Sequence, residues 1–380
     1  MEEIEHKSTY ILNEAARRKA SDIHIVPNRV DAYIYLRIHQ NLQFFEKISV
    51  KVCEKLISHF KFSAAMDIGE KRKPQNGSLE FIFQSRRISL RLSTIPTPFQ
   101  ESLVIRLLPQ DETLALEQLP LFPKDSLFLK QLTKKRSGLI IITGPTGSGK
   151  TTTLYSMMLA AKQANPINIV TLEDPVEKRT EGLIQLEIND KAGITYEEGL
   201  KAILRHDPDI IMVGEIRDQV TAQLAVRSAM TGHLVLTTMH TTDTISAINR
   251  LLELDIPKHD IEQTLVGVVT QRLVVRKCPL CGDNCSSYCD KIKNHKITAV
   301  YEMLLGSNLI NAKYKIFHNQ PFSISIRTLQ NQLIKAYALG FITQRSLERY
   351  GEMSEMGQVF KWNKESRNSS TIRLFVRARI

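Results

Sequence analysis

A phosphate-binding loop constrains this chain more than any other stretch of its sequence. Residues 144–151 read GPTGSGKT and follow an apolar run at 139–143. Such a loop works between a buried strand and the first turn of a helix, where backbone N–H groups converge on phosphate oxygens. Lys150 is expected to reach the β- and γ-phosphates, and the Thr151 hydroxyl to ligate Mg²⁺. The residues predicted to bind the nucleotide, ATP, are Gly144, Pro145, Thr146, Gly147, Ser148, Gly149, Lys150, Thr151 and Thr152.

The sequence around this loop alternates short apolar strands with helices. Continuous apolar strands separated by helices are typical of a parallel sheet covered on both faces, so the predicted fold class is α/β with a mainly parallel sheet. The predicted strands are 139–143, 168–172, 209–213 and 234–238, and the predicted helices are 151–164, 195–206 and 218–231.

The first 108 residues follow a different pattern. Apolar residues alternate with polar ones over 30–38, 79–83 and 88–92, which indicates half-buried strands in a small α+β domain. Helices are predicted at 2–20 and 50–66, and a turn at 71–78, which contains Pro and Asn-Gly. The predicted organisation is an N-terminal domain at 1–108, a proline-containing linker at 109–124, an ATPase domain at 125–350 and a basic tail at 351–380.

Acidic residues follow two of the apolar strands. A P-loop needs carboxylates there, to hold Mg²⁺ through water and to orient the attacking water. Glu173 and Glu215 are the candidates, and the alternative is that they only cap helices or form ion pairs. His233 and His240 bracket the last strand. A lone histidine in such a place is more often structural, but an imidazole beside the γ-phosphate can report its presence.

Taken together, these motifs make the chain resemble the secretion ATPase superfamily, which powers type II secretion, type IV pili and competence pseudopili. The resemblance spans residues 21–281. Its segments are SDIHI at 21–25, RLSTIPTP at 91–98, RLL at 106–108, the P-loop, TLEDPVE at 171–177, DPDIIMVGEIRD at 207–218, TGHLVLTTMH at 231–240 and QRL at 271–273.

The resemblance implies a PAS-like N-terminal domain followed by a RecA-like ATPase domain, assembled into a ring of six subunits. By residue, it implies that Glu173 is the catalytic base, that Glu215 helps to hold Mg²⁺ and that His240 contacts the γ-phosphate. Arg91 and Arg106 match arginines that approach the nucleotide from the N-terminal domain, where they would neutralise charge on the transferring phosphoryl group.

Four of the five cysteines form a cluster, at Cys278, Cys281, Cys285 and Cys289. In a cytosolic chain such a cluster suggests a metal site, and zinc is the candidate ion. Extension motors of the superfamily often carry two widely separated pairs, whereas here the second pair directly follows the first. The alternative is a loop of reduced cysteines that binds no metal. Cys53 stands alone and is predicted to lie in a core.

The net charge of +11 permits a surface for nucleic acid or anionic lipid, but the basic residues are spread along the chain rather than massed. No apolar stretch approaches the ~18 residues that span a bilayer, and the N-terminus lacks a hydrophobic signal region. We therefore expect a cytoplasmic protein that reaches the membrane surface through a partner. Direct DNA binding is not expected, because no stretch interleaves aromatic and basic residues.

A short chain with a cysteine cluster resembles the competence ATPase of Gram-positive bacteria, which assembles a pseudopilus for DNA uptake. This resemblance implies as partners a polytopic inner-membrane platform protein and, indirectly, pilins. The alternatives are a retraction or type II secretion motor of the same superfamily, a translocase that grips DNA, and a scaffold that binds ATP without hydrolysing it. The tail, TIRLFVRARI at 371–380, is predicted to be a disordered basic extension.

Overall fold

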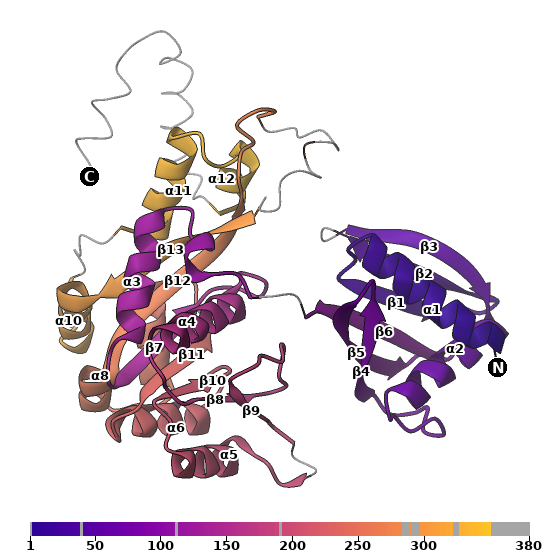
Figure 1. Cartoon of the computed structure of the whole chain (residues 1–380), viewed down its shortest axis with the longest axis horizontal. Helices are drawn as coiled ribbons and strands as arrows, with labels where there is room; N and C mark the ends of the chain where they lie inside the picture. The colour runs from indigo at the N-terminus through magenta and orange to yellow at the C-terminus, as the bar shows by residue number, and fades with distance from the viewer. Residues whose placement is uncertain are drawn as a thin grey trace. The chain divides into compact units, whose positions relative to one another are not determined.

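A computed structural model describes residues 2–38, 41–110, 113–189, 192–282, 289, 297–321 and 327–350. The chain forms two compact units. The first comprises Met1–Glu112 together with the short segment Glu177–Arg179, and the second comprises Thr113–Val176 and Thr180–Ile380. The predicted fold class is confirmed, since a sheet-rich N-terminal unit precedes an α/β unit whose sheet is mainly parallel (Figure 1).

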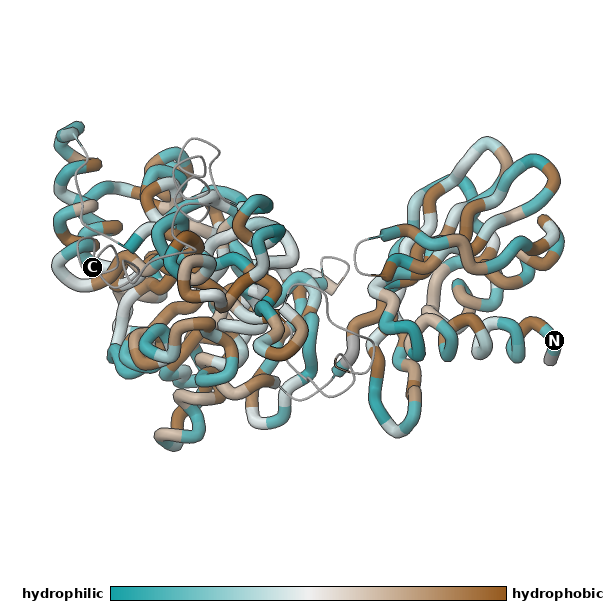
Figure 2. Tube along the Cα trace, turned by 90° about the horizontal axis from the view of Figure 1, so that it is seen from above, coloured by the Kyte–Doolittle hydropathy of each residue, from teal (hydrophilic) through white to brown (hydrophobic). Residues whose placement is uncertain are grey.

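The first unit is an antiparallel sheet covered on one face by two helices. Its strands lie in the order β3-β2-β1-β6-β5-β4. Alternate residues such as Ile23, Ile34 and Ile105 are fully buried beneath the helices. The helix that begins at the N mark in Figure 2 shows brown apolar residues between teal polar ones. The elements are α1 (Glu2–Arg17), β1 (Asp22–Pro27), β2 (Asp31–Ile38), β3 (Asn41–Ser49), α2 (Val50–Ser63), β4 (Gln75–Phe83), β5 (Arg86–Pro96) and β6 (Glu101–Pro109).

The turn predicted at 71–78 is partly wrong, because the Asn76-Gly77 pair lies inside strand β4. The chain reverses instead at Gln84 and Ser85, which have φ values of 46° and 66°. At Gly77 the constraint is close packing rather than turning. A Cβ atom there would lie 2.7 Å from Met66 Cγ.

The second unit contains a seven-stranded sheet in the order β13-β12-β7-β11-β10-β8-β9. All neighbouring strands are parallel except for the pair β12 and β13 at one edge. The four predicted strands are therefore present, and they are neighbours. The strands are β7 (Gly138–Thr143), β8 (Ile169–Glu173), β9 (Ile184–Glu187), β10 (Ile210–Val213), β11 (Leu234–Met239), β12 (Leu265–Val275) and β13 (Ile297–Leu305).

Helices cover both faces of this sheet (Figure 1). Ile140 and Ile142 pack against the layer of α3 and α4, whereas Leu139 and Ile141 pack against the layer of α5 to α8 and α10. Helices α11 and α12 form a smaller core with the ends of β12 and β13. The helices are η1 (Leu116–Gln118), α3 (Pro123–Thr133), α4 (Lys150–Ala164), α5 (Tyr196–Ile203), η3 (Leu204–His206), α6 (Gln219–Met230), α7 (Thr244–Glu253), α8 (Lys258–Thr264), α10 (Gly306–Phe317), α11 (Leu329–Ala338) and α12 (Gln344–Tyr350).

The segment predicted as a linker, 109–124, belongs largely to folded structure. Pro109 ends strand β6, and the second unit begins at Thr113. Leu116 and Leu119 are 1% and 7% exposed, because they pack against α4 and the sheet. The boundary between the two units falls within the predicted segment, and the part from Thr113 onward belongs to the second unit. The predicted tail at 351–380 lies outside the described residues. Among the described helices, none is both long and apolar enough to cross a membrane.

Candidate active site

The phosphate loop lies between buried strand β7 and helix α4, as the motif requires. Gly149 precedes the helix with a φ of 85°, and no side chain caps the first turn. The N–H groups of that turn are therefore oriented for an anion. At Gly144, with a φ of 147°, a Cβ atom would lie 2.7 Å from both Gln271 O and Ser148 Oγ. Only glycine fits this close approach.

Two buried polar atoms beside the loop indicate that it is built for a ligand. Ser148 Oγ and Gln271 Oε1 are buried, and neither has a hydrogen-bond partner within the described part of the chain. The amide of Gln271 meanwhile donates to the carbonyl oxygen of Ser148, which ties β12 to the loop. Buried polar atoms are rarely left unpaired, so an unpaired hydroxyl at an open helix N-terminus fits phosphate oxygens.

The structure brings Lys150, His240 and Glu215 together at one edge of the sheet. Lys150 is 7% exposed, and its Nζ lies 3.5 Å from Nδ1 of His240. On the other side of the imidazole, Nε2 lies 3.1 Å from Glu215 Oε2. Lys150, His240 and Glu215 thus lie in a line. The strand order explains this arrangement, because β7, β11 and β10 are neighbours and the three residues follow their carboxyl ends.

Both ends of this line have further partners. Lys150 Nζ donates to the carbonyl oxygens of Gly144 and Pro145, at 2.9 and 3.3 Å. Glu215 is paired with Arg217, and its carboxylate raises the pKa of that guanidinium. Arg217 therefore compensates the charge of Glu215, and backbone carbonyl oxygens hold the ammonium group of Lys150.

The hydrogen-bond partners of Glu173 are different residues from Lys150, His240 and Glu215. Its side chain, at the end of β8, is 3% exposed. Its carboxylate accepts from Tyr155 on α4, from Thr171 on β8 and from Gln185 on β9. Sequence reasoning missed Tyr155 and Gln185. No distinct signal in the sequence marks Tyr155, because the buried side of the helix that begins at Lys150 also contains Thr153 and Ser156.

Arg91 and Arg106 lie side by side in the first unit, because they are register partners across β5 and β6. Asp22 stands opposite Arg106 on β1. Its Oδ1 accepts from Arg106 Nε at 2.8 Å, and its Oδ2 lies 3.7 Å from Arg37 Nε. Arg106 and Arg37 therefore flank the Asp22 carboxylate, and Arg91 lies next to Arg106 on the neighbouring strand. Sequence reasoning named Asp22 and Arg37 only as parts of motifs and strands.

His233 lies at the other end of strand β11 from His240. Its Nδ1 is within hydrogen-bonding distance of the Thr231 hydroxyl and the Ser228 carbonyl oxygen. This ring stabilises the turn before the strand, which is the structural alternative stated for it. His240 alone of the two lies at the phosphate loop.

Three of the predicted cysteines converge between β12 and β13. The sulfur atoms of Cys278, Cys281 and Cys289 lie within 4.8 Å of one another, with 3.6 Å between Cys278 and Cys289. Thiolates around one tetrahedral zinc ion are about 3.8 Å apart, so the donor set fits zinc. Cys285 lies outside the described residues. Cys53 is fully buried in the core of the first unit, and burial raises its pKa to about 11.

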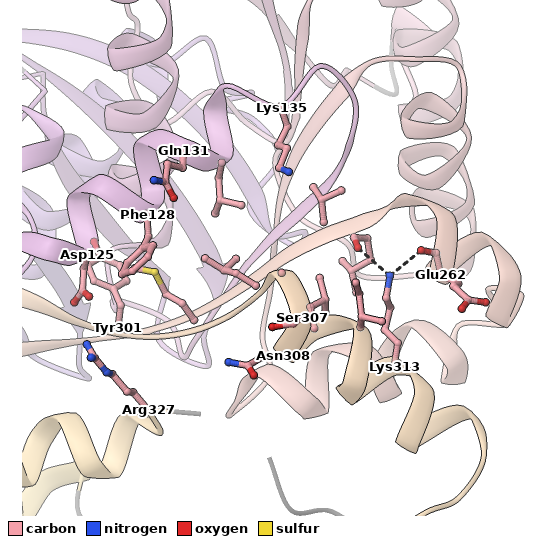
Figure 3. A pocket seen from close by; sticks show the side chains of 18 of the residues that line it. Asp125, Phe128, Gln131, Lys135, Glu262, Tyr301, Ser307, Asn308, Lys313 and Arg327 are labelled. Atoms are coloured by element: carbon pink, nitrogen blue, oxygen red, sulfur yellow. Dashed lines mark hydrogen bonds between the residues drawn. The ribbon is translucent and has the colours of Figure 1, made fainter. Parts of the chain in front are cut away.

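A separate cavity of about 790 Å³ lies among α3, α10 and the ends of β12 and β13 (Figure 3). Its lining includes Leu265, which is the register partner of Leu139 near the start of β7. The phosphate loop follows the other end of that strand. Asp125 and Arg327 lie at one end of the view and Lys313 at the other. The cavity contains none of the residues predicted to bind the nucleotide.

This fold and this set of side chains define a P-loop ATPase with a RecA-like sheet. The chain belongs to the family of type II/IV secretion system proteins, which it matches over residues 1–347.

Three known proteins illustrate the relationship. Competence protein ComGA of Bacillus subtilis (strain 168) is 50% identical over 351 residues, or 92% of this chain and 98% of that protein. ComGA of Halalkalibacterium halodurans is 47% identical and covers 82% of this chain and 90% of its own length. Among solved structures, the pilus retraction motor PilT with bound ADP superimposes with a TM-score of 0.68 and 26% identity, covering 92% of this chain and 98% of PilT.

Proposed function

We propose that this chain is a cytoplasmic ATPase motor that powers assembly of a competence pseudopilus for DNA uptake. The observation that carries the proposal is the 50% identity to a competence protein over 98% of that relative's length. The proposal includes a homohexamer at the cytoplasmic face of the membrane. Its partner there is a polytopic platform protein, through which the ring acts on pilins.

The chemistry we propose is hydrolysis of the bond between the β- and γ-phosphates of ATP by water. Glu173 accepts a proton from the attacking water, and the water oxygen bonds to the γ-phosphorus as the ADP oxygen leaves. Lys150 and His240 contact the phosphates, where their N–H groups offset the negative charge that moves to the leaving oxygen. Arg91 and Arg106 add positive charge at the γ-phosphate.

Thr151 and Glu215 fit a magnesium site, since a hydroxyl and a carboxylate are the oxygen ligands this ion takes. When bound, Mg²⁺ neutralises charge on the β- and γ-phosphate oxygens. In the structure, the Glu215 carboxylate is paired with Arg217 and lies within hydrogen-bonding distance of His240. We therefore expect the Glu215 side chain to exchange these partners for water when nucleotide binds.

A strain that carries Lys150→Ala tests the proposed function. Loss of the lysine removes the principal cation at the phosphates, so ATP turnover, surface pseudopili and DNA uptake should all be lost. Lys134→Ala is the matched control, because Lys134 is an exposed lysine after α3. Normal pseudopili and DNA uptake in the Lys150→Ala strain would refute the proposal.

A retraction motor is the second candidate, because PilT is similar over 92% of this chain. The same strain separates the two functions. A motor that assembles pili leaves Lys150→Ala cells bare, whereas a motor that retracts them leaves those cells with more or longer pili. Electron microscopy of pili on the cell surface reads out this difference.

We further propose that Cys278, Cys281, Cys285 and Cys289 bind one zinc ion. The support is the convergence of the three described sulfur atoms. Purified protein should contain one equivalent of zinc by elemental analysis. Cys278→Ser should lose the metal, and Cys53→Ser should retain it. Metal-free protein as isolated, with no uptake of added zinc, would argue for reduced cysteines that bind no ion.

A further inference from the structure

A buried hydrogen-bond network surrounds Glu173. The Tyr155 hydroxyl lies 2.8 and 2.9 Å from the two carboxylate oxygens. Thr171 Oγ1 lies 2.7 Å from Oε1, and Gln185 Nε2 lies 3.3 Å from the same atom. Tyr155 is 2% exposed and Glu173 is 3% exposed. The bulk solvent therefore contributes little to holding this carboxylate in place.

The network has a defined direction. Gln185 Nε2 also donates to the Tyr155 oxygen at 2.9 Å. Because that oxygen accepts from Gln185, the hydroxyl proton of Tyr155 points toward Glu173. All three neighbours thus donate to the carboxylate. Donors directed at a carboxylate from three residues hold it in one orientation, and a general base needs a fixed orientation.

Tyr155 links this network to the phosphate loop. It lies on α4, the helix whose first residue is Lys150. The lysine that contacts the phosphates and the hydroxyl that holds the carboxylate are therefore carried by one helix. A base works well only when its distance from the reacting atoms is fixed, and a shared helix fixes it relative to the phosphates.

We propose that Tyr155 is a positioning residue for ATP hydrolysis, which orients the Glu173 carboxylate, with Gln185 fixing the direction of the tyrosine hydroxyl. This inference rests on the proposed role of Glu173 as the base. It adds a residue of the phosphate-loop helix that acts on the reaction through the base.

The test compares two tyrosines whose buried hydroxyl groups lie at helix α4. Tyr155→Phe removes the hydroxyl that faces Glu173. Tyr301→Phe is the matched control, because Tyr301 is 1% exposed and its hydroxyl lies 3.0 Å from Thr153 Oγ1 on α4. Tyr301 lines the separate cavity of Figure 3. Each variant therefore removes one buried hydroxyl at α4, and only Tyr155→Phe changes the surroundings of Glu173.

ATP turnover by the full-length protein is measured at varied ATP. For Tyr155→Phe we expect kcat to fall about tenfold or more with KM within about twofold of wild type, because the base loses its fixed orientation while the phosphate contacts remain. Tyr301→Phe should match wild type in both kcat and KM. A wild-type kcat for Tyr155→Phe, or an equal effect of both variants, would overturn the inference.

Glu173→Gln separates this inference from the proposed function. Turnover by Glu173→Gln close to that of wild type would refute Glu173 as the base, and the inference would fail with it. If Glu173→Gln is inactive while Tyr155→Phe keeps the wild-type kcat, the base assignment stands and only the positioning role of Tyr155 is refuted. Urea unfolding of both phenylalanine variants shows whether either result reflects lost stability.

Discussion

Lys61 and Glu101 form an ion pair inside the first unit, where their side chains are 1% and 5% exposed. Lys61 Nζ lies 2.9 and 3.1 Å from the two carboxylate oxygens and also donates to the carbonyl oxygen of Glu70. Removing one partner leaves the other charge buried and uncompensated. At the residue scale, such a buried ion pair stabilises the fold, and the hydrophobic pattern of the sequence does not predict it.

Lys61→Met should therefore lower the free energy of unfolding of the first unit by about 3 kcal/mol or more. The control is Lys71→Met, since Lys71 pairs with Glu54 at the surface, where the side chains are 51% and 48% exposed. That change should cost less than about 1 kcal/mol. Urea unfolding measures both, and equal effects would contradict the burial argument.

Asp22 gives the first unit a pH-dependent contribution to stability. Burial alone would raise its pKa, but hydrogen bonds from Arg106 and Ser21 outweigh burial and hold the pKa below its ordinary value. A carboxyl with a lowered folded-state pKa stabilises the fold above its ordinary pKa of about 4, and this contribution is lost as the pH falls through the folded-state value.

The stability difference between wild type and Asp22→Asn should thus stay constant from pH 7 to about pH 5 and shrink below about pH 4. Urea unfolding of the two proteins over this pH range provides the measurement. A difference that persists unchanged at pH 3 would show that the carboxylate charge of Asp22 contributes nothing.

At the element scale, strand β4 packs closely against the end of helix α2. Gly77 permits this contact, because a Cβ atom there would lie 2.7 Å from Met66 Cγ and 2.8 Å from the carbonyl oxygen of Ala64. Met66 can adjust, but the backbone oxygen cannot move without shifting the end of the helix. The glycine is therefore required by packing between two elements and not by a turn.

Gly77→Ala should destabilise the first unit by about 1–3 kcal/mol through this overpacking. Gly69→Ala is the control, since its added Cβ would meet only Asp67 Oδ1, at 3.4 Å. Thermal unfolding of both variants checks the prediction, which fails if Gly77→Ala is as stable as Gly69→Ala.

At the scale of the whole molecule, the two units have separate hydrophobic cores. Leu90 and Ile105 belong to the core of the first, and Ile141 and Val235 to a core of the second. A unit with its own core can fold by itself. The proposed chemistry, in contrast, takes residues from both units, because Arg91 and Arg106 lie in the first and the phosphate loop in the second.

A fragment of residues 1–112 should therefore unfold cooperatively when expressed alone. A fragment of residues 113–350 should bind nucleotide and hydrolyse it at least about tenfold more slowly than the full chain, since the arginines are missing. Calorimetry and turnover assays measure the two results. Full activity in the second fragment would remove Arg91 and Arg106 from the proposed site.

Parts of this architecture could be predicted because they depend on patterns of neighbouring residues in the sequence. The strand before Gly144 was readable from its continuous apolar run, and the strands of the first unit from their alternation. The prediction of a turn at Asn76-Gly77 was wrong because a glycine can be required by close packing as well as by a turn. The boundary between the units falls within the predicted linker, but the burial of Leu116 and Leu119 could not be predicted, because distant residues build the core that they enter.

By itself, the sequence determined the phosphate loop, the strand and helix beside it, and the acids and histidine that follow neighbouring strands. These features depend on the chemistry and spacing of nearby residues. Only the tertiary structure decided that Lys150, His240 and Glu215 form one line, that Tyr155 holds Glu173, and that Asp22 lies beside Arg106. The reason is physical: these contacts join residues 18 to 90 positions apart, and only the order and register of the strands bring them within hydrogen-bonding distance.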